Sequence, residues 1–225
     1  MIIYVIFALV VVTILAWTLI PNRPLRWATG ILSGLALVGA IGVMSANFAN
    51  HYGMKKVTTT TTQRIYSAAG SKSPAGVLVT KQLGTKSGRY VLVYADTANG
   101  KAKAHFVPKQ KHITTAVKQH ATYRTANVKQ ATLKTTTTRW EWKSKRAKFW
   151  LNVGDQAGEL VSQYRTVTIP KDTWLAVTPN QMKKLQKAMA SGNTGAANSQ
   201  TAALSSLSKD QQAAMVVKVA KKALE

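Results

Sequence analysis

Two apolar runs open the chain and decide its class. Met1–Ile20 reads MIIYVIFALVVVTILAWTLI, Trp27–Ala49 reads WATGILSGLALVGAIGVMSANFA, and neither contains a charged side chain. At about 1.5 Å per residue, some twenty helical residues cross the roughly 30 Å hydrocarbon core of a membrane. The runs therefore predict two transmembrane helices, at 1–20 and 27–49, joined by a short loop over 21–26.

The segment between the runs, Pro21–Arg26, has the composition of a loop at a membrane surface. It holds two prolines and two arginines, Arg23 and Arg26, and is flanked by Trp17 and Trp27. Tryptophan and arginine are enriched at the membrane–water interface, so we expect these four residues to lie there. A cleaved signal peptide is the alternative for the first run, but it would need a basic start and a small-residue cleavage site, which this run lacks.

The charges around the two runs bear on topology. Arg23 and Arg26 favour a cytoplasmic loop, which would place both termini outside the cell. Lys55 and Lys56 follow the second run closely and favour the opposite orientation, but long domains cross membranes largely regardless of charge. We therefore expect a multi-pass protein of the cell membrane whose large domain is extracytoplasmic.

Small residues recur along the second run. Gly30 and Gly34 form one Gly-x-x-x-Gly pair, and Gly42 and Ala46 form a similar small-x-x-x-small pair. Such pairs allow two helices to approach closely in lipid. They predict packing of the second helix on the first, or a face for a homodimer or another membrane protein.

The charge of the protein is concentrated after these runs. The chain has 225 residues and a formal net charge of +24, of which residues 50–225 carry +22. It has no cysteine, which excludes disulfides and cysteine-bound metals. With 7 acidic residues in total, the composition also argues against an enzyme that relies on paired carboxylates.

Residues 57–190 follow a juxtamembrane segment, 50–56, and read as a β-rich domain. Strands are predicted at 57–62, 76–83, 89–95, 161–169 and 173–177, and Asn99-Gly100 indicates a two-residue hairpin. A second hairpin is predicted between Thr135–Trp142 and Lys148–Val153, turning at residues 144–146. The fold class is therefore a membrane helical hairpin plus an antiparallel β-rich domain, a sandwich or a partly open barrel, with helices at its C-terminal end.

Two capping boxes mark helices near the end of the chain. Thr178–Gln181 begins a helix that runs to about Ala190, and Ser208–Gln211 begins a basic helix within 208–225. Residues 191–207 between them are uncharged and rich in Gly, Asn, Ser and Ala, which is typical of a flexible linker. The last helix is amphipathic, and three interpretations are open: it lies on a membrane, it docks on the domain, or it is an alanine-rich helix of marginal stability.

Several of these segments together resemble a known family. The two apolar runs, Arg139–Trp142 (RWEW), Glu159–Val161 (ELV) and Ile169–Trp174 (IPKDTW) are similar to a family of uncharacterised membrane proteins from lactobacilli and related Gram-positive bacteria. The resemblance covers most of the chain apart from its end. It implies a membrane location, and it implies no activity, cofactor or catalytic residue.

Motifs for covalent chemistry are missing from the sequence. His105, His112 and His120 match no zinc spacing, and Asp155 and Glu159 lie in a turn-like segment. The chain has no phosphate-binding glycine loop and no nucleophile elbow. We therefore expect a protein that is not an enzyme and that has no catalytic residue, metal site or cofactor.

The densest positive charge lies between Asn99 and Trp150, a stretch that contains 13 Lys and Arg residues and one acidic residue, Glu141. Such a segment attracts polyanions. The function expected is non-enzymatic binding of anionic envelope components, either teichoic acid or lipid headgroups. An accessory subunit of a membrane complex and a cytoplasmic nucleic-acid tether are the alternatives, although a membrane hairpin is an unusual anchor for nucleic acid. The candidate anion-binding residues are Lys101, Lys103, Lys118, Arg124, Lys129, Lys134, Arg139, Lys143, Lys145, Arg146 and Lys148.

Overall fold

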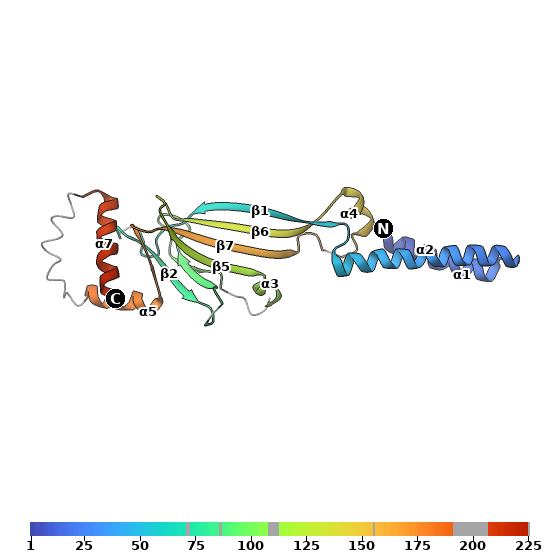
Figure 1. Ribbon diagram of the computed structural model, residues 1–225, viewed down its shortest axis with the longest axis horizontal. Coiled ribbons are helices and arrows are strands. Elements are labelled where there is room, and N and C mark those ends of the chain that lie inside the picture. Colours follow the sequence, from blue (N-terminus) through green and yellow to red (C-terminus); the bar gives the residue numbers. More distant parts are fainter. Residues whose placement is uncertain (71–72, 86, 108–112, 155, 191–206, 225) are drawn as a thin grey trace. The chain divides into compact units, whose positions relative to one another are not determined.

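The computed structural model of the chain describes residues 1–70, 73–85, 87–107, 113–154, 156–190 and 207–224 (Figure 1). The chain forms two compact units. Unit 1 comprises Met1–Thr58 and Thr138–Ser162, and unit 2 comprises Thr59–Thr137 and Gln163–Glu225. Most of the expected linker, together with His112 and Asp155, lies outside the described residues.

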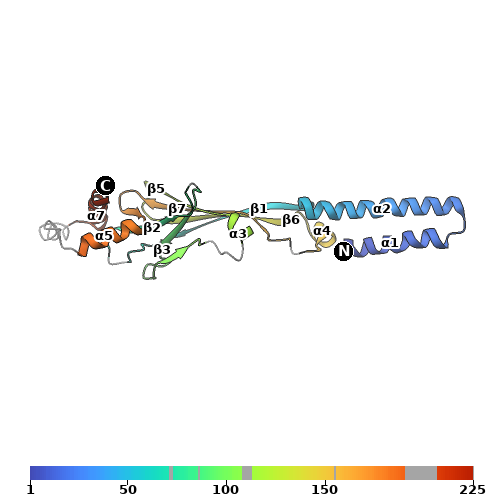
Figure 2. The ribbon, with the colours of Figure 1, turned by 90° about the horizontal axis from the view of Figure 1, so that it is seen from below.

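Unit 1 begins with an antiparallel pair of helices, α1 (Ile2–Leu19) and α2 (Arg23–Asn50), which lie side by side in Figures 1 and 2. Both are long and apolar enough to cross a membrane, and only 11% of the most apolar window of each is buried. The Thr13 hydroxyl donates a hydrogen bond to the Ser33 hydroxyl across the pair, at 3.0 Å. Arg23 lies at the start of α2, and Arg26 in its first turn, because Pro24 is favourable at the beginning of a helix. The predicted loop over 21–26 is therefore shorter in the structure.

The C-terminal end of α2 is capped by a left-handed residue and by a side-chain hydrogen bond. His51 adopts a left-handed conformation with φ 54°, and the Asn47 amide donates to the Tyr52 carbonyl at 2.7 Å. Asn47 is only 2% exposed, and this hydrogen bond gives its buried amide the partner that it needs. The chain then turns at Gly53 into strand β1 (Met54–Arg64).

A short helix replaces one predicted hairpin strand. Strand β6 (Thr132–Trp142) ends before Ser144, and helix α4 (Lys145–Leu151) follows it. The Ser144 hydroxyl accepts a hydrogen bond from the Ala147 backbone N–H at 3.1 Å, which is an N-cap. The predicted strand over Lys148–Val153 is therefore wrong, because this cap and the i, i+4 spacing of Ala147 and Leu151 favour a helix.

Two four-stranded sheets make up the β-rich part, and neither closes into a barrel, which confirms the expected fold class. The first sheet has the order β1-β6-β7-β5 and the second has the order β4-β3-β2-β8. Two pairs are parallel, β5 with β7 and β2 with β8, so the sheets are mixed rather than wholly antiparallel. The remaining elements are β2 (Gly76–Gln82), β3 (Tyr90–Tyr94), β4 (Lys103–His105), α3 (Ile113–Val117), β5 (Gln119–Ala126), β7 (Leu160–Pro170) and β8 (Trp174–Val177).

The core of unit 2 joins residues of both sheets. Leu133 and Val167 of the first sheet belong to the same buried cluster as Leu78 and Leu92 of the second. The hairpin from β3 to β4 has a longer connection than the predicted two residues, because Tyr94 pairs with Lys103.

Two helices, α5 (Pro179–Ala190) and α7 (Lys209–Leu224), pack on the second sheet. Ala213 and Val217 of α7 are buried in a cluster with Leu175 and Val177 of β8. Both predicted capping boxes form, and in the second the Ser208 backbone N–H donates to the Gln211 side chain at 3.0 Å. The last helix thus docks on the domain, which leaves its buried apolar side unavailable to a membrane.

Candidate functional site

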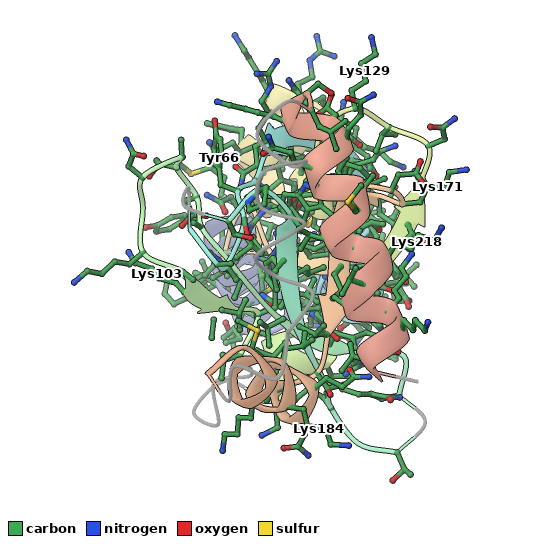
Figure 3. All side chains as sticks on the ribbon, turned by 90° about the vertical axis from the view of Figure 1, so that its left-hand side faces the viewer. Tyr66, Lys103, Lys129, Lys171, Lys184 and Lys218 are labelled. Atoms are coloured by element: carbon green, nitrogen blue, oxygen red, sulfur yellow. The ribbon has the colours of Figure 1, made fainter. Side chains whose placement is uncertain are left out.

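The eleven candidate anion-binding residues fall into both units. Figure 3 shows that Lys103 and Lys129 of unit 2 point away from the protein in different directions. Lys171 and Lys218, which were not among the candidates, point outward on a further side. The charges of unit 2 are therefore spread over its surface. The six in unit 2 are Lys101, Lys103, Lys118, Arg124, Lys129 and Lys134, and the five in unit 1 are Arg139, Lys143, Lys145, Arg146 and Lys148.

In unit 1, four of the candidates gather at one short helix. Lys145, Arg146 and Lys148 belong to α4, and Lys143 precedes its N-cap. All four side chains are exposed. Because seven residues contain three cations and no acid, α4 has the strongest local charge among the described elements.

A groove lies between this helix and the hairpin. Its volume is about 570 Å³, and Lys143, Ser144 and Arg146 supply its polar side chains apart from the Tyr52 phenol. The floor is apolar and comes from all three helices. It is formed by Ile2 and Val5 of α1, Gly39, Ala40 and Val43 of α2, and Ala147, Trp150 and Leu151 of α4.

Backbone contacts hold α4 against the rest of unit 1. The Met1 amino group donates hydrogen bonds to the carbonyls of Phe149 and Trp150, at 3.2 and 3.3 Å. A Cβ atom at Gly53 would lie 2.8 Å from Leu151 Cδ1, so the helix approaches a residue without a side chain. Figure 2 shows α4 next to the start of α1.

Aromatic side chains lie at both ends of the hairpin. Phe149 and Trp150 are 57% and 48% exposed, and their rings meet edge to face at 5.5 Å. At the other end the rings of Trp17 and Trp27 meet edge to face at 5.2 Å, beside Arg26. Exposed aromatic rings next to cations at both ends of an apolar helix pair are typical of two interfacial belts.

A polar cluster fixes the chain where α2 meets the β-strands of unit 1. The His51 ring stacks on Trp140 with centroids 4.3 Å apart, and His51 Nε2 lies 3.3 Å from a Glu159 carboxylate oxygen. Lys56 Nζ lies 5.2 Å from the centre of the Trp140 ring, and Arg139 donates to the Gly158 carbonyl at 2.6 Å. These contacts give Glu159 a structural partner, and they engage Arg139 in holding a loop.

The four small residues of α2 have different surroundings. A Cβ atom at Gly30 would lie 2.5 Å from Trp17 Nε1, so this glycine lets α1 approach. At Gly34 and Gly42 a Cβ atom would meet nothing within 4 Å, and Ala46 is half-buried. Packing of the helix pair thus uses Gly30, and the dimer face stays a prediction.

Among the described residues, no group of three or more His, Asp or Glu side chains could hold a metal ion. Of the three histidines considered for zinc, His105 stacks on the buried Tyr94 with centroids 3.9 Å apart. His120 accepts a hydrogen bond from the Arg89 guanidinium at 3.0 Å. Burial and the Arg89 charge both lower the pKa of His120, so its ring is neutral at pH 7.

The sequence interpretation missed the apolar part of the groove. Ile2, Val5 and Gly39 were assigned to membrane spans, and Trp150 to a strand. The stretch Lys145–Leu151 (KRAKFWL) carries the signal that could have identified the site, because cations followed by exposed aromatics are typical of interfacial helices.

The described chain thus combines two apolar helices long enough to cross a membrane, two mixed β-sheets and a basic helix beside the helix pair. Residues 22–185 match a protein family described as a domain of unknown function, DUF4811, and the chain belongs to this family. The match includes α2, α4 and both sheets. No curated protein and no solved structure matches the chain.

Proposed function

We propose that the protein is anchored in a cell membrane by α1 and α2 and binds the headgroups of anionic lipids beside α4, without catalysing a reaction. The observation that carries this proposal is the groove, in which Lys143 and Arg146 lie at the edge of an apolar floor. A lipid has the matching chemistry, because its phosphate can pair with the cations while an acyl chain covers the floor.

The surface of the hairpin supports the membrane anchor. Phe7, Leu32, Leu35 and Val38 are each at least 66% exposed, and exposing so many large apolar side chains to water is costly. A core helix of a soluble protein would be mostly buried, whereas 11% of each apolar window is buried here. The belts at Trp17 and Trp150 lie at opposite ends of the hairpin, which is where the two membrane surfaces would be.

The position of the charge favours lipid headgroups over teichoic acid as the ligand. Lys145, Arg146 and Lys148 share a helix with exposed Phe149 and Trp150, and aromatic rings insert among headgroups. Each such cation near an anionic surface contributes about 1 kcal/mol to binding. The scattered lysines of unit 2 would instead strengthen a weaker, salt-sensitive attraction to any nearby polyanion.

For orientation, we place the connection between α1 and α2 in the cytoplasm and unit 2 outside the cell. Arg23 and Arg26 support this topology through the positive-inside rule. Protease added to intact protoplasts, whose cell wall has been removed, should digest unit 2. Digestion only after the cells are permeabilised would contradict this topology and favour a cytoplasmic partner, including nucleic acid.

Lipid retention by the purified full-length protein tests the proposed binding. Native mass spectrometry counts lipids that remain bound after exchange from phosphatidylglycerol or phosphatidylcholine micelles. We expect retention of phosphatidylglycerol, and at least a tenfold loss in the double variant Lys143→Glu/Arg146→Glu. The double variant Lys101→Glu/Lys103→Glu changes the net charge equally and should retain the lipid.

An equal loss in both variants would overturn the headgroup site, because it would mean that total charge decides binding. Absence of lipid retention together with salt-sensitive binding of purified teichoic acid would assign the charge to that polymer instead.

A second function, an accessory subunit of a membrane complex, is favoured by the uncovered glycines of α2. A Cβ atom at Gly34, Gly39 or Gly42 meets nothing within 4 Å, so another helix could pack there closely. Co-purification of a partner in mild detergent, lost in the variant Gly34→Leu, would support this function. Purification without a partner from the native membrane would count against it.

A further inference from the structure

A second cavity lies in unit 2, separate from the groove beside α4. Its volume is about 310 Å³, and it contains the side chains of Arg165 on β7, His105 on β4 and Tyr94 on β3. Thr61 and Gln63 of β1, Thr135 of β6 and Asp96 add further polar side chains to its wall. The first sheet thus contributes a cation and two hydroxyls, and the second contributes two rings.

The Arg165 guanidinium forms no ion pair with any acidic residue that the structure describes. It lies over the Phe106 ring at 4.6 Å, and the part of the chain that the structure describes offers it no hydrogen bond or ion pair. Burial lowers the pKa of Arg165, which means that its charge has lost part of its hydration. An arginine always stays charged in proteins, so an anion in the cavity would supply the missing interaction.

The rest of the cavity adds groups for hydroxyls. The Asp96 carboxylate lines the same cavity and lies 3.6 Å from His105 Nε2. Burial and the Asp96 charge raise the pKa of Tyr94, so its phenol keeps its proton at pH 7. A carboxylate can accept hydrogen bonds from ligand hydroxyls, which a simple anion does not have.

We propose that this cavity binds a phosphorylated polyol, with the phosphate on Arg165 and the hydroxyls on Asp96. A planar guanidinium suits a phosphate because it donates two parallel hydrogen bonds. The hydroxyls of Thr61 and Thr135 lie in the same wall and can donate to the remaining phosphate oxygens. The site is independent of the lipid groove, whose residues all belong to unit 1.

Isothermal titration calorimetry, in which glycerol 3-phosphate is added to the full-length protein in detergent, tests the proposal. We expect saturable binding that falls at least tenfold in Arg165→Gln, since charge-assisted hydrogen bonds are lost. Arg124→Gln is the matched control, because Arg124 is an exposed strand arginine whose Nε donates to Thr168 rather than to the cavity. It should bind as the wild type does. The groove variant Lys143→Glu/Arg146→Glu should also bind normally.

The carboxylate gives a second, independent readout. Asp96→Asn should weaken glycerol 3-phosphate several-fold relative to inorganic phosphate, because only the polyol has hydroxyls for Asp96. No binding to the wild type, equal binding in Arg165→Gln, or no change in this ratio would each overturn the proposal. If Arg165→Gln fails to fold by circular dichroism, the Asp96→Asn ratio decides the outcome.

Discussion

The side chain of Leu151 occupies the space that a Cβ atom would need at Gly53. The two positions are 2.8 Å apart, and Gly53 has φ +84°, a conformation that other residues rarely adopt. Helix α4 therefore depends on a glycine 98 positions earlier in the chain for its place beside the hairpin. This contact connects the end of α2 with the charges proposed to bind lipid.

Replacing that glycine should release α4. Gly53→Ala adds a methyl group against Leu151, and we expect trypsin to cleave α4 at least several-fold faster at Lys145 or Arg146, because a displaced helix frays. Gly158→Ala is the matched control. Gly158 has the same φ of +84° but open space, so both variants cost about 1 kcal/mol of backbone strain and only the first displaces α4. Equal cleavage in both would contradict the contact.

The pairing of α1 with α2 should depend on Gly30 and not on Gly34. A Cβ atom at Gly30 would lie 2.5 Å from Trp17 Nε1, so Gly30→Val would collide with that ring, whereas a Cβ atom at Gly34 would meet nothing within 4 Å. A Thr13→Cys/Ser33→Cys pair reports the pairing, since these hydroxyls lie 3.0 Å apart and the chain has no cysteine of its own. We expect oxidation to form this disulfide readily in the Gly34→Val background and several-fold less in Gly30→Val.

Acid should weaken unit 2 through His120. Arginine can only donate, so the bond from Arg89 requires a neutral His120 ring. Because the pKa of His120 is lowered on folding, the unfolded chain takes up the proton first as the pH falls below about 6.5. The stabilisation is therefore present above that pH and is lost below it.

Urea unfolding of the wild type and of His120→Gln at pH 7.5 and 5.0 measures this loss. The wild type should lose more of its free energy of unfolding on acidification than the variant. Since His51 and His105 are present in both proteins, their contributions cancel in this comparison. An identical pH dependence would show that His120 does not contribute.

Docking of α7 should fail when its buried side becomes charged. Val217 is 3% exposed and Val219 is 54% exposed on the same helix. Val217→Asp should lower the free energy of unfolding by about 2–4 kcal/mol, because a charge in an apolar cluster has no partner. Val219→Asp should change it by less than about 0.5 kcal/mol. Urea unfolding compares the two, and similar losses would mean that α7 is not held by its apolar side.

The elements with strong local signals could be predicted from the sequence. The apolar runs specify α1 and α2, and the capping boxes at Thr178 and Ser208 specify the starts of α5 and α7. In these cases residues a few positions apart supply the interaction, so the sequence contains the complete pattern. The stretch after Trp142 was misassigned because alternating apolar residues there also fit a strand, and the N-cap at Ser144 decided for a helix.

The candidate sites could be predicted only in part. Their charges are visible in the sequence, but the groove needs Ile2, Gly39 and Arg146 together, and the cavity of unit 2 needs Asp96 with Arg165. Parallel pairing of β5 with β7 was also missed, because strand direction depends on a connection through β6 rather than on a local pattern.

The sequence by itself determined two apolar helices, a strongly basic β-rich chain and the absence of thiol chemistry, because length, composition and periodicity are local properties. Only the tertiary structure decided which charges act together. Of eleven basic candidates it gathers Lys143, Lys145, Arg146 and Lys148 around one helix. It also places Arg165, which the sequence did not distinguish, in a cavity with Asp96. The physical reason is that burial and pairing decide what a charge can bind, and both depend on residues distant in the chain.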